Sequence, residues 1–149
     1  LYNDHKDQLK PEIVWNIEKG MNLTSEQIST AEKQRVKILK NTQTFFQKYD
    51  LLLCPATIVP PFPVGERYVS QCEGHQFETY IDWLNIVSAI TLTCCPALSL
   101  PAGFTEDHLP VGIQIVAANR DEGKLLSGSA FIEELLNIKQ KLPIDPKTR

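Results

Sequence analysis

Glycine is scarce and scattered in this sequence of 149 residues. Its seven glycines stand at positions 20, 65, 74, 103, 112, 123 and 128, and no two lie closer than five positions. This spacing excludes a G-x-G-x-x-G dinucleotide loop, a G-x-S-x-G nucleophile elbow and any glycine- and serine-rich oxyanion loop. Gly123 and Gly128 have the spacing of a phosphate-binding loop. However, Ser129 and Ala130 follow where that motif requires Lys and then Ser or Thr.

Basic residues are not in excess either. The chain has 15 Lys and Arg against 18 Asp and Glu, which gives a net charge of −3 and an isoelectric point near 5.6. Such a chain offers no positive field to phosphates, so nucleic acid is not an expected partner. With 42% hydrophobic residues it can form a sizeable core, whereas disordered chains combine low hydrophobicity with high net charge.

Long hydrophobic runs are absent as well. The longest uncharged stretch, 23 residues between Asp82 and Glu106, holds two prolines, an asparagine and a glycine, and only 14 of its residues are hydrophobic. This composition predicts a helix followed by a strand rather than a membrane span. The sequence opens on Leu1, without the basic-then-apolar start of a secretory signal. We therefore expect no membrane partner, a cytoplasmic location and a segment preceding Leu1.

The four cysteines match no zinc-binding pattern. They are Cys54, Cys72, Cys94 and Cys95, and a disulfide between the adjacent pair would be strained. We expect free thiols in a reducing compartment, with Cys54, Cys94 and Cys95 buried, and neither a metal nor a cofactor. Cys72 and His75 could form a nucleophile and its base, but no third group orients them. A cysteine enzyme, with Cys72 or Cys94 reactive, is a distant alternative.

The spacing of apolar residues predicts an α/β fold. Helices are expected over residues 6–20, 25–49, 77–91 and 120–138, and short strands over residues 51–54, 97–100 and 111–116. The first strand is a continuous apolar run, which predicts a buried parallel strand. Three short strands are few for so many helices, so they indicate the edge of a larger sheet. A large exposed apolar patch, or a dimer that covers it, should then be present.

Two of these helices begin with capping-box signals. Thr24 with Gln27, and Asn119 with Glu122, have the three-residue spacing of that motif. In the last helix, four residues are predicted to face inward: Leu125, Leu126, Ile132 and Leu135.

Arg35 lies on the apolar stripe of the second helix. Either its stem lies on the core while its guanidinium reaches water, or it forms a buried pair with an acid.

Prolines gather after the first predicted strand. Pro55, Pro60, Pro61 and Pro63 fall within nine positions, where neither a central strand nor a helix interior can form. Residues 55–75 are therefore predicted to form an extended surface loop at the edge of a pocket. The tail, residues 142–149, is predicted to be loose.

Three segments, taken in order, resemble the amidase signature family. Residues 49–57 read YDLLLCPAT, similar to the family's YDxLLxPT. Residues 93–104 read TCCPALSLPAGF, similar to TGxPAxSxPxGF, with Cys94 where the family usually has glycine. Residues 109–116 read LPVGIQIV, similar to LPVGLQIV, and the DExxLL pattern follows from Asp121. The resemblance covers roughly residues 7 to 138.

The resemblance implies that residues 1–149 are the C-terminal portion of a mixed-sheet α/β/α fold. Family members are amide hydrolases or the amidotransferase subunit that frees ammonia from glutamine. Their catalytic Ser, second Ser and Lys lie upstream, in a segment rich in Gly and Ser. This sequence has no Ser-Ser pair, so no catalytic residue carries over, and the chain alone is predicted to be inactive. Its expected partners are a small amide substrate, together with the upstream part of the protein or a second copy.

The same resemblance suggests where substrate would bind. In the family, the loop after the PT motif and the start of the helix before TGxPA lie near the acyl side of the pocket. This implies substrate-binding roles for Asp82, Trp83 and the loop of residues 56–62. General considerations favour a core aromatic for Trp83 and a solvated charge for Asp82. The alternative function is a non-enzymatic α/β binding or scaffold module.

Overall fold

The computed structural model describes residues 2–137, which fall into two compact units, residues 2–37 and 38–137. The first unit contains a 3-10 turn, Lys6–Gln8, the helix α1, Pro11–Met21, and the beginning of α2, Ser25–Phe46. The helix predicted over residues 6–20 therefore begins later. Lys10 is extended and Pro11 is the first helical residue, as the ring of proline fixes a helical φ and restricts the residue before it.

The start of α2 confirms the first capping box. The backbone N–H of Gln27 donates to Thr24 Oγ1 over 3.2 Å, and that of Thr24 donates to Gln27 Oε1 over 2.8 Å. Further along α2, Arg35 is 43% exposed and its Nη1 lies 3.8 Å from Glu32 Oε2. This supports the interpretation in which the guanidinium reaches water, with a carboxylate one turn away.

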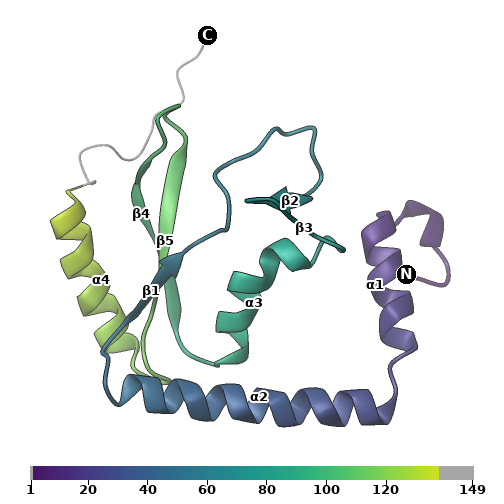
Figure 1. The fold of residues 1–149 in the computed structure, drawn as a ribbon, viewed down its shortest axis with the longest axis horizontal. Coiled ribbons are helices and arrows are strands. Elements are labelled where there is room, and N and C mark those ends of the chain that lie inside the picture. The colour runs from purple at the N-terminus through teal and green to yellow at the C-terminus, as the bar shows by residue number, and fades with distance from the viewer. Residues whose placement is uncertain (1, 138–149) are drawn as a thin grey trace. The chain divides into compact units, whose positions relative to one another are not determined.

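The second unit contains a three-stranded antiparallel sheet (Figure 1). Its strands are β1, Leu52–Pro55, β4, Ala97–Phe104, and β5, Pro110–Val116, in the order β1-β5-β4. The α/β class is confirmed, but the predicted parallel strand at residues 51–54 is wrong. Leu52 pairs with Val116 and Pro55 with Ile113, in antiparallel register. A continuous apolar run indicates that a strand can be buried on both faces. It does not indicate whether the strand runs parallel or antiparallel to its neighbour.

Strand β4 is twice as long as predicted. It passes through Pro101, which pairs with Gly112, and the register shifts between Pro101 and Gly103. In the described sheet, β4 is an edge strand, so the missing N–H of proline need not cost a ladder hydrogen bond. The strand therefore continues through Pro101 and does not end at residue 100 as predicted.

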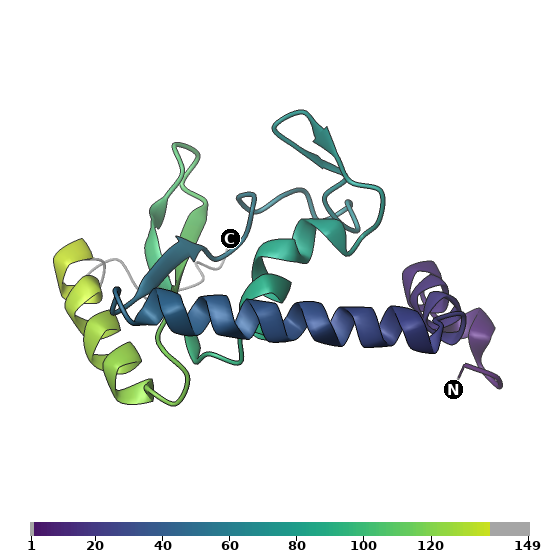
Figure 2. The same cartoon turned by 60° about the horizontal axis from the view of Figure 1, so that its bottom comes forward.

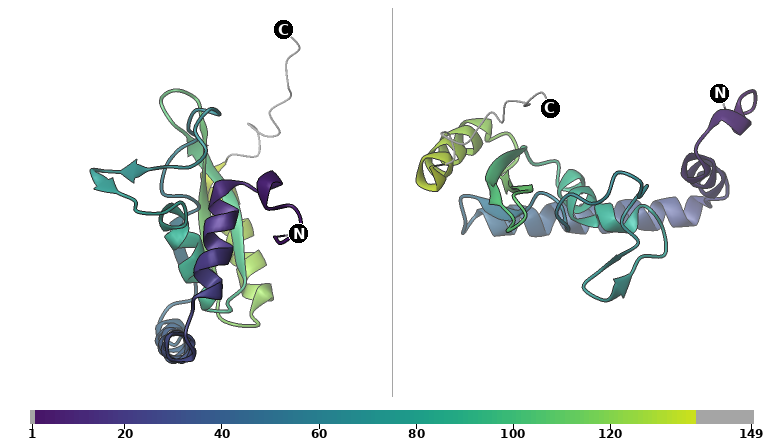
Figure 3. Two further views of the ribbon diagram at one scale, coloured as in Figure 1. Left: turned by 90° about the vertical axis from the view of Figure 1, so that its right-hand side faces the viewer. Right: turned by 90° about the horizontal axis from the view of Figure 1, so that it is seen from above.

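The segment between β1 and β4 is less helical than predicted. The predicted loop contains a small hairpin, β2, Gln71–Cys72, and β3, His75–Gln76, that stands away from the main sheet (Figures 2 and 3). Its turn residues Glu73 and Gly74 both have positive φ, 47° and 79°, as a two-residue type I′ turn requires. The helix predicted from residue 77 is a 3-10 turn, Asp82–Leu84, followed by α3, Asn85–Leu92.

The last helix, α4, Glu122–Leu136, packs against one face of the sheet (Figure 1). Its cap is Asp121, whose Oδ1 accepts from the backbone N–H of Lys124 over 3.3 Å. The predicted capping residue Asn119 has another role, because its Nδ2 donates to the carbonyl oxygen of Cys94. The second capping-box prediction is therefore wrong.

A small core joins α4 to the sheet. Its buried members are Leu100, Ile115, Ala117 and Leu125, and four half-buried residues pack against them: Leu51, Leu98, Ile113 and Ile132. Gly128 lets the helix approach closely, since a Cβ there would lie 2.6 Å from Leu51 Cδ1. Two residues predicted to face inward, Leu126 and Leu135, are instead more than half exposed, as is Phe131. The buried stripe of α4 is thus narrower than its sequence suggests.

Cys94 occupies a left-handed backbone conformation. Its φ is 56°, in the turn that leads from α3 into β4. A side chain at this φ costs roughly 1–2 kcal/mol, whereas glycine adopts it freely. Glycine, which the TGxPA motif usually has at this position, would adopt this backbone conformation without strain.

We predict that Cys94→Gly stabilises the protein by about 1 kcal/mol. The gain from relieving the left-handed conformation exceeds the roughly 0.5–1 kcal/mol of extra chain entropy that glycine loses on folding. Urea denaturation measures the difference, and Cys94→Ala is the control because it removes the thiol but keeps Cβ. Equal stability of the Gly and Ala variants would contradict the assignment of strain to this residue.

Candidate functional site

A hollow of about 420 Å³ opens beside the end of β1. Four elements border it: the proline-rich loop, the 3-10 turn Asp82–Leu84, and the strands β4 and β5. Its lining residues are Ala56, Thr57, Ile58, Val59, Pro60, Pro61, Phe62, Trp83, Ser99, Pro110, Val111 and Gly112. None of these side chains is charged, so the hollow suits an uncharged, largely apolar group.

The loop on one side of the hollow is fixed at its start. The backbone N–H of Ala56 donates to the carbonyl of Gly112 over 3.1 Å, which extends the pairing of β1 with β5 by one residue. The hydroxyl of Thr57 donates to the carbonyl of Val59 over 2.6 Å. With φ fixed at Pro60 and Pro61 as well, the loop has little freedom to leave the rim.

Two aromatic rings meet at the rim. Phe62, from the loop, and Trp83, from the 3-10 turn, have ring centroids 5.8 Å apart and planes at 89°. This edge-to-face arrangement is favourable. It holds together two segments that lie about twenty residues apart in the sequence. Trp83 thus presents a large apolar surface to the hollow.

The floor of the hollow depends on a glycine in β5. A Cβ at Gly112 would lie 3.3 Å from Ser99 Oγ, which is tighter than ordinary contact, and 3.4 Å from Ala56 Cβ. The glycine therefore keeps the floor open where three segments converge. The Ser99 hydroxyl brings a hydrogen-bonding group to an otherwise apolar floor.

The two site residues predicted from the sequence have different places. Trp83 lines the hollow with the loop of residues 56–62, so the structure brings these two predicted parts together. Asp82 is not among the lining residues, and its Oδ2 accepts from the backbone N–H of Thr79 over 2.8 Å. This hydrogen bond steadies the turn that carries Trp83.

The cysteines differ from their predicted surroundings. Cys94 is exposed rather than buried, and Cys54 and Cys95 are half-buried. Cys54 Sγ donates to Gln114 Oε1 over 3.5 Å, and burial raises the pKa of this thiol, which favours an inert group. Cys72 pairs with His75 across the hairpin, but its thiol donates to the Ile58 carbonyl over 3.7 Å. Within residues 2–137, no three His, Cys, Asp or Glu side chains gather in a metal-binding group.

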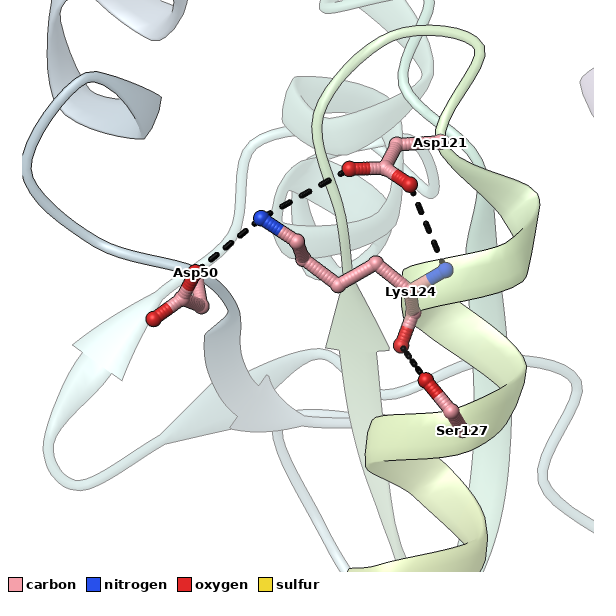
Figure 4. Close-up of polar contacts among 4 residues, drawn as sticks. All are labelled: Asp50, Asp121, Lys124 and Ser127. Carbon is pink, nitrogen blue, oxygen red and sulfur yellow. Dashed lines mark hydrogen bonds and ion pairs between the residues drawn. The ribbon is translucent and has the colours of Figure 1, made fainter.

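A group of three charged side chains links α4 to Asp50, two residues before β1 begins (Figure 4). Lys124 Nζ donates to Asp50 Oδ1 over 3.0 Å and lies 3.7 Å from Asp121 Oδ2. The hydrogen bond to Asp50 raises the pKa of Lys124 above its usual value. A raised lysine pKa stabilises the fold below the pKa of the unfolded chain, and this contribution is lost as pH rises through the folded value. All three groups are solvent-exposed, so salt screens the interaction.

The antiparallel sheet, the helix packed on it and the uncharged hollow beside it define a protein of the α/β class. Residues 2–126 match the sequence model of the family described as Amidase. The chain therefore belongs to the amidase family, and the resemblance seen in its three motifs is confirmed.

Known relatives include both amidotransferase subunits and an acylamidase. The chain is 39% identical over 104 residues to a subunit of the glutamyl-tRNA(Gln) amidotransferase of Thermus thermophilus, and the match covers 70% of this chain and 20% of the relative. It is 32% identical over 124 residues to an acylamidase of Rhodococcus erythropolis, covering 83% and 26%. The chain thus spans about a fifth to a quarter of the length of these relatives.

Solved amidase structures share the fold. A bacterial aryl acylamidase superposes with a TM-score of 0.77 at 23% identity, over 97% of this chain and 31% of that one. A structure described as an amidase gives 0.78 at 23% identity, over 90% and 30%. In the part of the chain that the structure describes, no helix is both long and apolar enough to cross a membrane.

Proposed function

We propose that this chain forms the C-terminal part of an amide hydrolase and supplies one wall of its substrate pocket. The observation that carries the proposal is the uncharged hollow, closed on one side by the proline-rich loop and Trp83. Such a wall fits the apolar acyl or aryl part of a small amide. Membership of the family and the relatives named as acylamidase and amidotransferase support amide chemistry.

The catalytic Ser, second Ser and Lys would come from outside these 149 residues. The sequence has no Ser-Ser pair, and its glycines are too far apart for an oxyanion loop. Solved relatives align with this chain over only about 30% of their own length, which leaves ample room for such a segment. In this proposal, that segment or a second copy also covers the exposed apolar side chains of α4.

The proposal includes a cytoplasmic location and roles for two predicted residues. Within residues 2–137, none of the four cysteines forms a disulfide, which suits a reducing compartment. Trp83 contacts the apolar part of the substrate. Asp82 acts on Trp83 through the turn it stabilises.

We predict that the chain binds acetanilide, a simple aromatic amide, at Trp83. NMR titration should show saturable shifts of the Trp83 indole N–H and of the Phe62 ring, while the Trp15 indole, in the other unit, stays unchanged. Phe62→Ala should weaken binding about tenfold, because it removes an aromatic partner together with apolar contact area. Leu126→Ala, an exposed position on α4, is the control and should leave affinity unchanged.

Two results would contradict the proposed pocket wall. One is an unshifted Trp83 indole throughout the titration. The other is equal shifts of Trp15 and Trp83, since that would indicate general adsorption of the ligand to aromatic side chains. A loss of binding in both Phe62→Ala and the control would likewise count against the hollow as the site.

A further inference from the structure

A second hollow, of about 540 Å³, lies elsewhere in the same unit. It lies between the C-terminal half of α2, where Phe46 borders it, and the turns that precede β4 and follow β5. Cys94, Cys95 and Asn119 line it from these turns. It shares no lining residue with the hollow beside Trp83. The second hollow is therefore separate from the hollow beside Trp83.

Hydrogen bonds fix the turn that carries the two cysteines. The backbone N–H of Cys94 donates to the Thr91 carbonyl over 3.3 Å, and that of Cys95 donates to Thr93 Oγ1 over 3.2 Å. From the opposite turn, Asn119 Nδ2 donates to the Cys94 carbonyl. With its backbone held from both sides and Cys94 exposed, the turn presents two adjacent thiols at one hollow.

We propose that Cys94 and Cys95 form a two-thiol site for trivalent arsenicals that carry one organic group. Both thiols add to the arsenic of an R–As=O compound: two S–H bonds break, two As–S bonds form, and the arsenic oxygen leaves with both protons as water. The arsenic stays trivalent, so the reaction needs neither an oxidant nor a reductant. Soft sulfur ligands suit such a soft centre.

A bridged arsenical fits this turn better than a disulfide does. A disulfide needs an S–S distance near 2.05 Å and a dihedral near 90°, which adjacent residues reach only with strain. An arsenic atom between the sulfurs lets them lie farther apart and enlarges the ring by one atom. The second thiol also reacts intramolecularly, so the pair binds far more tightly than either thiol alone.

The other two cysteines provide matched controls within the same unit. Cys54 donates its thiol hydrogen to Gln114, and Cys72 donates to the Ile58 carbonyl, in separate parts of the sheet and the hairpin. Neither has an adjacent cysteine in the sequence. Each can form only one bond to arsenic, which added thiols displace readily.

The test uses phenylarsine oxide and the whole 149-residue chain. One equivalent should lower by two the number of thiols that react with Ellman's reagent, and intact mass should show one phenylarsenic group per chain. Cys94→Ser and Cys95→Ser should each weaken binding at least a hundredfold. Cys54→Ser and Cys72→Ser should not. Cys94→Gly, which relieves the left-handed backbone and so keeps the fold, should also lose binding.

Three outcomes would overturn the site. Binding that survives Cys94→Gly or Cys95→Ser would exclude the two-thiol bridge. Binding of two arsenicals per chain would show that the thiols react separately. The third outcome concerns oxidation by mild peroxide without any arsenical. If all four thiols are lost at one common rate, Cys94 and Cys95 do not form a distinct pair.

Discussion

Purified residues 1–149, without any other segment, should hydrolyse no amide above the uncatalysed rate. A serine amidase needs a nucleophile, a group that takes its proton and donors for the developing oxyanion, all in one place. The hollow beside Trp83 offers two hydroxyls, those of Thr57 and Ser99, and no charged lining residue to serve as a base. Removing nucleophile and base together costs on the order of a millionfold in rate in the serine proteases.

Release of ammonia from primary aliphatic and aromatic amides, and of aniline from acetanilide, measures this directly. Steady turnover that scales with protein and survives replacement of all four cysteines by serine would refute the inactivity. Turnover lost only with Cys72→Ser or Cys94→Ser would instead establish the cysteine-enzyme alternative. Ser99→Ala is the matched control for the hollow and should change nothing in a chain without catalysis.

The largest effect on stability is expected for Ile115→Ala. Ile115 lies in the central strand β5 with no solvent exposure, paired with Leu53 on one side and Leu98 on the other. Removing three carbons from such a site leaves a cavity and costs about 3–4 kcal/mol. Because few other residues of the unit are fully buried, this loss should remove most of its stability.

Chemical denaturation monitored by far-ultraviolet circular dichroism tests this expectation. The midpoint should fall sharply for Ile115→Ala. Val64→Ala, at a fully exposed position of the same unit, should change the free energy of unfolding by less than about 0.5 kcal/mol. A small change in the free energy of unfolding for Ile115→Ala would mean that the buried cluster beneath α4 does not stabilise the sheet.

Local signals predicted local structure well in this chain. The Thr24 capping box is correct because both of its hydrogen bonds lie within four residues. The similar signal at Asn119 failed because that side chain donates to a carbonyl 25 residues away, which no local pattern reveals. Strand β5 was predicted to within one residue since its apolar run has clear ends. The direction of β1 was wrong because direction depends on pairing.

The candidate site was predicted only in part for the same reason. The proline-rich loop and Trp83 stand out by composition and by the family resemblance. Ser99 and Gly112 were missed as lining residues, although both fall inside quoted motifs, because the β1-β5-β4 order brings them beside Ala56. Asp82 was assigned through the family resemblance, by its place at the start of the helix before the TGxPA motif, yet its carboxylate accepts from the backbone three residues back.

The most direct test of the central claim is a chimera with the Rhodococcus erythropolis acylamidase, its aligned segment replaced by that of this chain. We predict that the chimera hydrolyses acetanilide, and that Trp83→Ala within it raises KM several-fold with little change in kcat, as expected for a residue that only binds substrate. A chimera that matches the parent enzyme in thermal stability and size but hydrolyses no anilide would contradict the account.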